Sequence, residues 1–209
     1  MSAPASADEP VEQLGRALDA TGELVAGVRA DQWDAPTPCA GWTARELVNH
    51  VVGGNRLFAQ LLRGEPMPSP EQAALLRGAD HLDRDPLTAY QQAGTVLREA
   101  FRQPGVLAQT FPSPVGAVPG MVMVHLRITE LLVHGWDLAH ATAQPVDLPA
   151  DLAEQELRFS RGKLADVPAG HSPFGPPQPV SADAPAIDQL AACLGRPIPP
   201  DAASSAQSP

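Results

Sequence analysis

Glu130 and His134 are the residues of this sequence whose types and spacing most clearly point to chemistry. They stand four residues apart in the most apolar stretch of the chain, so on a helix both side chains project from one face. A carboxylate and an imidazole placed in this way can chelate one divalent ion, with ligand distances of ~2.0–2.2 Å for zinc. A third ligand must come from another element. His50 is the best candidate because it stands beside a predicted apolar stripe.

A purely structural interpretation of the same pair competes with the metal hypothesis. An ionised carboxylate in apolar surroundings is unfavourable unless it is paired or bound to a metal, and a buried ion pair meets that need without any metal. A single histidine on an apolar helix face is more often a hydrogen-bonded core residue than a ligand. Spacing therefore predicts that the two side chains interact, and leaves open whether a metal joins them.

Asp137 follows His134 by three residues and so shares its side of the helix. Its carboxylate can hold the imidazole in one tautomer, as outer carboxylates do around metal-binding histidines. Pairing with an arginine or with solvent is an alternative of equal weight.

The other candidate residues have simpler interpretations. His125 and His140 fall on other faces of the same helix, where structural or solvated roles are expected. Cys39 precedes a predicted helix whose terminal amides can lower a thiol pKa, but a small buried hydrophobe is the favoured role. The tryptophans are predicted to anchor the core: Trp33, Trp42 and Trp136.

Helices are the elements that must position these residues. Apolar residues recur at steps of three and four along several segments, and most of the 24 prolines lie between those segments. Thr43 and Glu46 have the spacing of a capping box at the start of the segment that carries His50. The stretch around Glu130 is apolar nearly all round, which is typical of a helix buried on most sides. The expected long helices cover about residues 9–28, 43–63, 86–103, 121–142 and 150–164, with short ones near 71–77 and 184–194.

These segments predict an all-α fold, an up-down four-helix bundle with an extra C-terminal helix and an irregular proline-rich segment. No run shows the period-two alternation of a strand between hairpin turns, so negligible sheet is expected. Residues 1–166 are predicted to form the bundle. Residues 167–209 are predicted to form a proline-rich segment with one short helix and a disordered tail.

Composition excludes several classes of protein. The chain has 209 residues and a formal net charge of −10, so binding to the phosphate backbone of a nucleic acid is not expected. The first residues lack the basic and apolar regions of a signal peptide, and no apolar run reaches the roughly 18 residues of a spanning helix. The two cysteines lie too far apart for a zinc finger. We expect a cytoplasmic protein without membrane contact, either a monomer or a homodimer.

Two sequence segments resemble the signature of a known family. Residues 37–50, TPCAGWTARELVNH, resemble the Thr-Pro-Cys-x-x-Trp-x-x-x-(Asp/Glu)-Leu-x-x-His pattern of the mycothiol-dependent maleylpyruvate isomerase N-terminal family. Residues 130–139, ELLVHGWDLA, resemble the second half of that signature. Residues 174–177 and 188–196 are similar to an actinobacterial branch of uncharacterised metal-binding proteins in this superfamily. The resemblance covers most of residues 10–197.

The resemblance implies a DinB/YfiT-like four-helix bundle that binds a divalent metal, usually zinc. By position the ligands would be His50, Glu130 and His134, the same residues that the spacing suggests. Members of known activity bring a low-molecular-weight thiol to the metal for isomerisation or S-transfer. By the same resemblance, we expect no counterpart here of the full-length C-terminal domain that helps to build the substrate cleft of maleylpyruvate isomerase itself.

The leading functional hypothesis is a metal-dependent S-transferase or isomerase that uses mycothiol or a related thiol and acts on a small molecule. Asp137 would then orient His134 from behind the metal. A cosubstrate with sugar and carboxylate groups needs positive side chains nearby, and Arg45 and Arg127 are the candidates for cofactor binding, although each also suits the rim of a bundle. The alternatives are a metal-dependent hydrolase and a non-catalytic metal-binding protein in stress response or binding.

Overall fold

Capping residues and prolines determine where the main helices begin. The computed structural model describes residues 9–113, 116–164 and 174–199. At the start of α2 (Ala44–Leu62) the Thr43 side chain accepts from the Glu46 amide, and the Glu46 carboxylate accepts from the Thr43 amide at 2.8 Å. This confirms the predicted capping box. Asp85 caps α4 (Pro86–Phe101) by accepting from the Thr88 amide.

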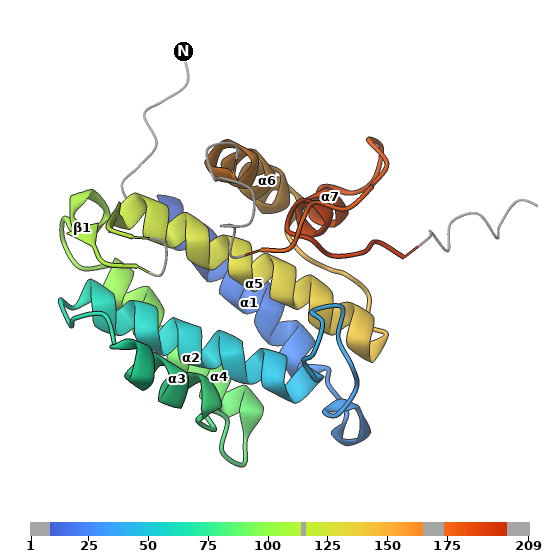
Figure 1. Cartoon of the computed structure of the whole chain (residues 1–209), viewed down its shortest axis with the longest axis horizontal. Helices are drawn as coiled ribbons and strands as arrows, with labels where there is room; N and C mark the ends of the chain where they lie inside the picture. The colour runs from blue at the N-terminus through green and yellow to red at the C-terminus, as the bar shows by residue number, and fades with distance from the viewer. Residues whose placement is uncertain (1–8, 114–115, 165–173, 200–209) are drawn as a thin grey trace, which may run out of the picture.

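Four long helices of the described part form the bundle (Figure 1). Besides α2 and α4 they are α1 (Glu9–Ala26) and α5 (Gly120–Thr142). Each packs against two others in a ring, α1 on α4 and α5, and α2 on α4 and α5. The helices expected near 9–28, 43–63, 86–103 and 121–142 are therefore present, with ends that differ by at most two residues.

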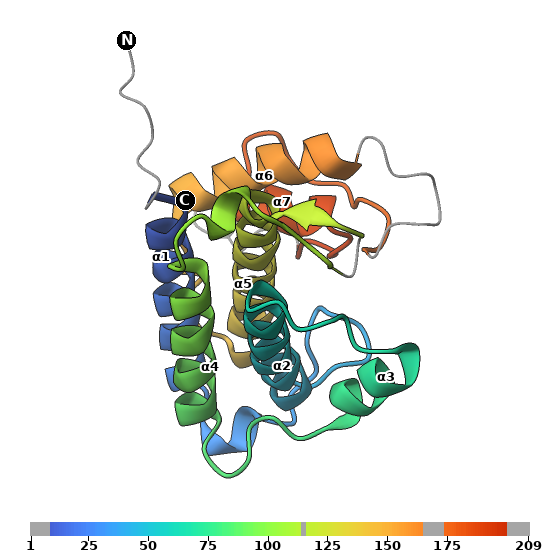
Figure 2. The same cartoon turned by 90° about the vertical axis from the view of Figure 1, so that its left-hand side faces the viewer.

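The helix directions differ in one respect from the expected up-down order. α2 and α5 are antiparallel, because His50 lies near His134 whereas Asn55 lies near Arg127. α2 and α4 run in the same direction (Figures 1 and 2). The reason is the long connection over residues 63–85, which contains α3 (Pro70–Gly78) and carries the chain back before α4 starts.

α5 occupies the centre of the molecule. α1 and α2 cover part of its surface, and α6 (Ala150–Leu164) and α7 (Ala186–Cys193) pack on it from the side away from α2 (Figure 1). Its buried residues include side chains all round the helix, as its sequence predicts. Polar groups on α5 are consequently enclosed by protein and need partners within it.

The short elements complete the fold. Single turns of 3₁₀ helix lie at Ala30–Gln32 and Val106–Ala108, and β1 (Thr110–Phe111) pairs antiparallel with β2 (Val118–Pro119). The expectation of an all-α fold with negligible sheet is confirmed, since the sheet in the described part of the chain consists of these two short strands. No helix within the described ranges combines the length and the apolar character needed to cross a bilayer.

Two predictions concern residues outside the described ranges. The proposed boundary between residues 166 and 167 falls in the gap between residues 164 and 174, and the predicted disordered tail lies after residue 199. Both stay predictions. α6, which the sequence predicts to be part of the bundle, makes its most extensive contacts with α7.

Candidate functional site

His50, Glu130 and His134 come together between α2 and α5. Their ligand atoms all lie within 4.8 Å of one another, and His50 Nε2 stands 3.7 Å from Glu130 Oε2. The two imidazole rings meet edge to face with their centroids 5.2 Å apart. The antiparallel packing of α2 on α5 thus brings His50 to the pair on α5, although Glu130 lies 80 positions after it in the sequence.

Arg127 determines the environment of Glu130. It lies one turn earlier on α5, and its Nη1 donates to Glu130 Oε2 at 2.5 Å. Its Nη2 donates to Asn55 Oδ1 at 2.9 Å, and the guanidinium stands 4.9 Å from the ring centroid of Phe58. A β-carbon at Gly54 would lie 2.8 Å from Nη1, so this glycine leaves the guanidinium its space.

These contacts favour the ionised form of Glu130. Burial by itself raises the pKa of the carboxyl, but the Arg127 guanidinium and the nearby His50 imidazole outweigh burial and hold the pKa well below its usual range. Arg127 is 1% exposed, so the carboxylate also neutralises a charge that solvent cannot reach.

His134 is buried and held in one orientation by Asp137. Its Nδ1 donates to Asp137 Oδ2 at 3.1 Å, and the Asp137 carboxylate is inaccessible to solvent. Burial lowers the pKa of His134 despite the opposing effect of Asp137, which favours a neutral ring. A neutral ring that donates through Nδ1 keeps a free lone pair on Nε2. The predicted partnership of Asp137 with His134 is present in the structure.

Trp42 covers the imidazole pair. Its ring centroid lies 4.6 Å from that of His50 and 5.8 Å from that of His134. The sequence predicts a core anchor at this position, and the half-buried ring does pack on the core. Its proximity to both candidate ligands was not foreseen.

Arg196 reaches the site from the segment after α7. Its Nη2 donates to Asp137 Oδ2 at 3.0 Å and contacts Cys39 Sγ at 3.5 Å. Burial raises the pKa of the half-buried Cys39 thiol, against the opposing effect of Arg196. No spacing rule connects residues 137 and 196, and the only sequence signal was the position of Arg196 at the end of the 188–196 motif.

The two arginines predicted to bind a cofactor both have protein partners. Arg127 is bonded to Glu130 and Asn55, as described above. Arg45 Nη2 lies 3.1 Å from Asp80 Oδ2 and donates to the Asp83 carbonyl at 3.0 Å, and its side chain is 38% exposed. Whether either one also contacts a cofactor stays a prediction.

The other histidines on α5 lie away from the trio. His125 Nδ1 lies 2.8 Å from Glu156 Oε1 on α6, and His140 Nδ1 lies 3.0 Å from the Trp136 carbonyl. These are the structural roles that their positions on other faces of the helix predict.

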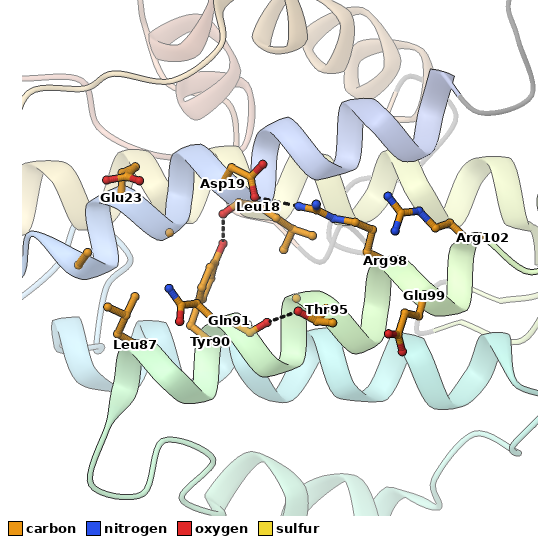
Figure 3. A pocket seen from close by; sticks show the side chains of 13 residues that line it. Leu18, Asp19, Glu23, Leu87, Tyr90, Gln91, Thr95, Arg98, Glu99 and Arg102 are labelled. Atoms are coloured by element: carbon orange, nitrogen blue, oxygen red, sulfur yellow. Dashed lines mark hydrogen bonds and ion pairs between the residues drawn. The ribbon is translucent and has the colours of Figure 1, made fainter.

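A groove of about 410 Å³ lies between α1 and α4, at a distance from this cluster. One pair of its charged side chains is satisfied within the groove, since Arg98 donates to Asp19 at 2.8 Å (Figure 3). None of the three candidate ligands lines the groove. The cluster between α2 and α5 is therefore the candidate functional site.

The donor set of the cluster suits a divalent metal. Two imidazoles and one carboxylate form a set found in catalytic zinc sites, in which a further coordination position stays open. The side chains of His50 and Glu130 are 37% and 28% exposed, so a small molecule can approach them from solvent. The Glu130 carboxylate has lone pairs beyond the one that accepts from Arg127. The residues present therefore fit a metal ion.

Comparison with known proteins shows the family of this chain. The family model described as the mycothiol maleylpyruvate isomerase N-terminal domain matches residues 14–139. Uncharacterized proteins from two strains of Mycobacterium tuberculosis, CDC 1551/Oshkosh and H37Rv, are each 39% identical over 191 residues, which is 91% of this chain and 99% of theirs.

The fold also matches solved structures. The crystal structure of the mycothiol-dependent maleylpyruvate isomerase is similar with a TM-score of 0.62 at 18% identity, and that of a point mutant of the enzyme with 0.64 at 17%. Each match covers 77% of this chain and 70% of the other.

Proposed function

This chain belongs to the mycothiol maleylpyruvate isomerase N-terminal domain family, and we propose that it is a metal-dependent enzyme that uses a low-molecular-weight thiol. The metal would be a divalent ion, zinc by its donor set, held by His50, Glu130 and His134. The thiol would be mycothiol or a compound like it, and the reaction an isomerisation or S-transfer on a small molecule.

One observation carries the proposal: three side chains with metal-ligating atoms, two of them from α5 and one from α2, have those atoms within 4.8 Å of one another at a site open to solvent. A structural ion pair would need only a carboxylate and one partner, and Glu130 already has Arg127 in that role. The ion pair of Glu130 with Arg127 does not require the two imidazoles, and an imidazole lone pair is a ligand for a cation.

A divalent cation bound there would lower the pKa of a coordinated thiol and so supply a thiolate nucleophile at neutral pH. The protein's own residues prepare the site for this chemistry. Arg127 fixes the Glu130 carboxylate, and Asp137 holds His134 with Nε2 free. Trp42 covers the imidazoles on one side, so the approach of a thiol is restricted to the other sides.

Metal analysis of the untagged protein and thermal melts with mycothiol test the proposal. We expect bound zinc, a rise in melting temperature with free mycothiol, and no rise with a thiol-blocked analogue, because only the free thiol can coordinate a metal. Equal stabilisation by both compounds would refute direct contact between metal and thiol. Zinc binding without any response to the thiol would favour a hydrolase or a non-catalytic metal-binding protein instead.

A further inference from the structure

A second set of three potential ligands adjoins the first and shares His134 with it. Among the described residues, Cys39, His134 and Asp137 also have ligand atoms that lie within 4.8 Å of one another. A thiolate, an imidazole and a carboxylate are a donor set that binds zinc and softer ions tightly. The two sets of ligands, His50–Glu130–His134 and Cys39–His134–Asp137, therefore compete for the same metal ion.

The guanidinium of Arg196 stands within this second set. Its Nη2 contacts two of the three ligand atoms, Asp137 Oδ2 at 3.0 Å and Cys39 Sγ at 3.5 Å, and its Nε lies 3.3 Å from each Asp137 oxygen. The third ligand atom, His134 Nδ1, donates to the same Asp137 oxygen. A cation thus already stands beside the sulfur and the carboxylate that a metal would need.

The backbone after α7 holds Arg196 in this place. The Gly195 amide donates to the Ala192 carbonyl and the Arg196 amide to the Ala191 carbonyl, both at 3.0 Å, which are the two bonds of a Schellman motif. Gly195 has a φ of 89°, a conformation that favours glycine, and a β-carbon there would lie 2.7 Å from Gly175 Cα. The arginine is therefore directed onto α5 by a rigid turn.

We propose that Arg196 closes the Cys39–His134–Asp137 set to metal ions and confines a divalent cation to His50, Glu130 and His134. The guanidinium fills the space between the Cys39 sulfur and the Asp137 carboxylate, and its permanent charge repels a cation there. Arg127 differs from it in this respect, because its partners are Glu130 and Asn55 and only Glu130 belongs to the first set of ligands. The bond from His134 Nδ1 to Asp137 is kept, so only Nε2 remains for a metal. The confinement of the cation to His50, Glu130 and His134 rests on the proposed function, whereas the closure of the Cys39–His134–Asp137 set by Arg196 does not.

Cobalt titration of the metal-free protein tests the closure, because a thiolate bound to Co²⁺ gives a charge-transfer band in the near ultraviolet. We expect no such band for the wild type. Arg196→Ala and Arg196→Gln should both gain it, and the matched variants that also carry Cys39→Ser should lose it again. Cys193 is present in every protein and serves as the internal control for adventitious binding to a thiol.

Circular dichroism at the titration temperature verifies that each variant is folded, and the glutamine variant keeps a donor for Asp137 if the alanine variant does not fold. Folded Arg196 variants that bind Co²⁺ without the band would overturn the inference. The wild type itself provides a test that needs no variant at position 196. With excess Cd²⁺, the wild type and its Cys39→Ser variant should have the same thiolate absorption. A band that the wild type has and Cys39→Ser lacks would overturn the closure.

The same titrations separate this inference from the proposed function. Wild-type protein that binds no Co²⁺, together with a band in the Arg196 variants, would refute the metal site at His50 and leave the closure intact. Wild-type protein that binds Co²⁺ through His50, together with variants that lack the band, would refute the closure alone.

Discussion

Replacing Glu130 with glutamine should destabilise the metal-free protein, and the reason is Arg127. If Glu130 faced only His134, the substitution would remove a costly buried charge and leave the metal-free protein as stable as the wild type. In the structure the carboxylate instead neutralises a guanidinium that is 1% exposed. Glutamine keeps the shape of the side chain and an acceptor oxygen for Nη1, but it leaves the positive charge without a counterion.

The magnitude follows from the remaining partners of Arg127. Removing one partner of a buried ion pair costs about 3–5 kcal/mol. Asn55 still accepts from Nη2, and the glutamine oxygen can accept from Nη1, so most of the hydrogen bonding survives. We therefore expect a loss of about 2 kcal/mol, in the range of a hydrogen bond to a charged group. For a chain of this length that corresponds to about 4–8 °C in melting temperature.

Urea and thermal unfolding of chelator-treated protein measure this loss, and its pH dependence identifies the cause. Glu130 has a depressed pKa in the folded state, so its contribution is present above the unfolded value of about 4.3 and is lost as the pH falls through the folded value. The stability difference between wild type and Glu130→Gln should thus shrink toward acid pH.

The double variant Arg127→Met/Glu130→Gln is the matched control, because it removes the stranded charge together with its partner. It should be more stable than Glu130→Gln alone. A metal-free Glu130→Gln protein that is as stable as the wild type would refute the reasoning. A double-mutant cycle that gives no coupling energy between Arg127 and Glu130 would refute it as well.

Three further expectations concern the ligands, the thiol and the fold. His50→Ala and His134→Ala should each abolish tight zinc binding, measured as metal content after dialysis, and full occupancy in His50→Ala would remove His50 from the ligand set. Arg45→Ala should weaken mycothiol binding in calorimetry without changing zinc content, whereas Asp80→Ala, which breaks the same exposed salt bridge, should not. Thr43→Ala should lower the free energy of unfolding by about 1 kcal/mol through loss of the capping box, and an unchanged urea midpoint would contradict this.

The helices and their ends follow from short-range rules that the sequence displays openly. Thr43 and Glu46 cap α2 because they are three residues apart, and Pro86 begins α4 because a first-turn proline lacks only an amide that has no helical partner. The pairing of Glu130 with His134, and of His134 with Asp137, is predictable for the same reason. Residues three or four apart on a helix are neighbours whatever the rest of the fold does.

The place of His50 beside an apolar stripe and the family resemblance both predict that it joins this pair. The structure brings it within reach through the packing of α2 on α5. The direction of α4 relative to α2 was not predictable in this way, because the course of the connection over residues 63–85 depends on tertiary contacts rather than on local periodicity.

The partners that come from other elements were decided by tertiary structure. Asn55 and Arg127 are 72 positions apart, and Asp137 and Arg196 are 59 positions apart. Periodicity describes which face a side chain takes on its own helix, but it carries no information about which other element will pack on that face. The sequence thus determined the helices, proposed the three metal ligands and set Arg127 three residues before Glu130 on one helix, whereas packing brought His50 and Asn55 to that pair and placed Arg196 behind His134.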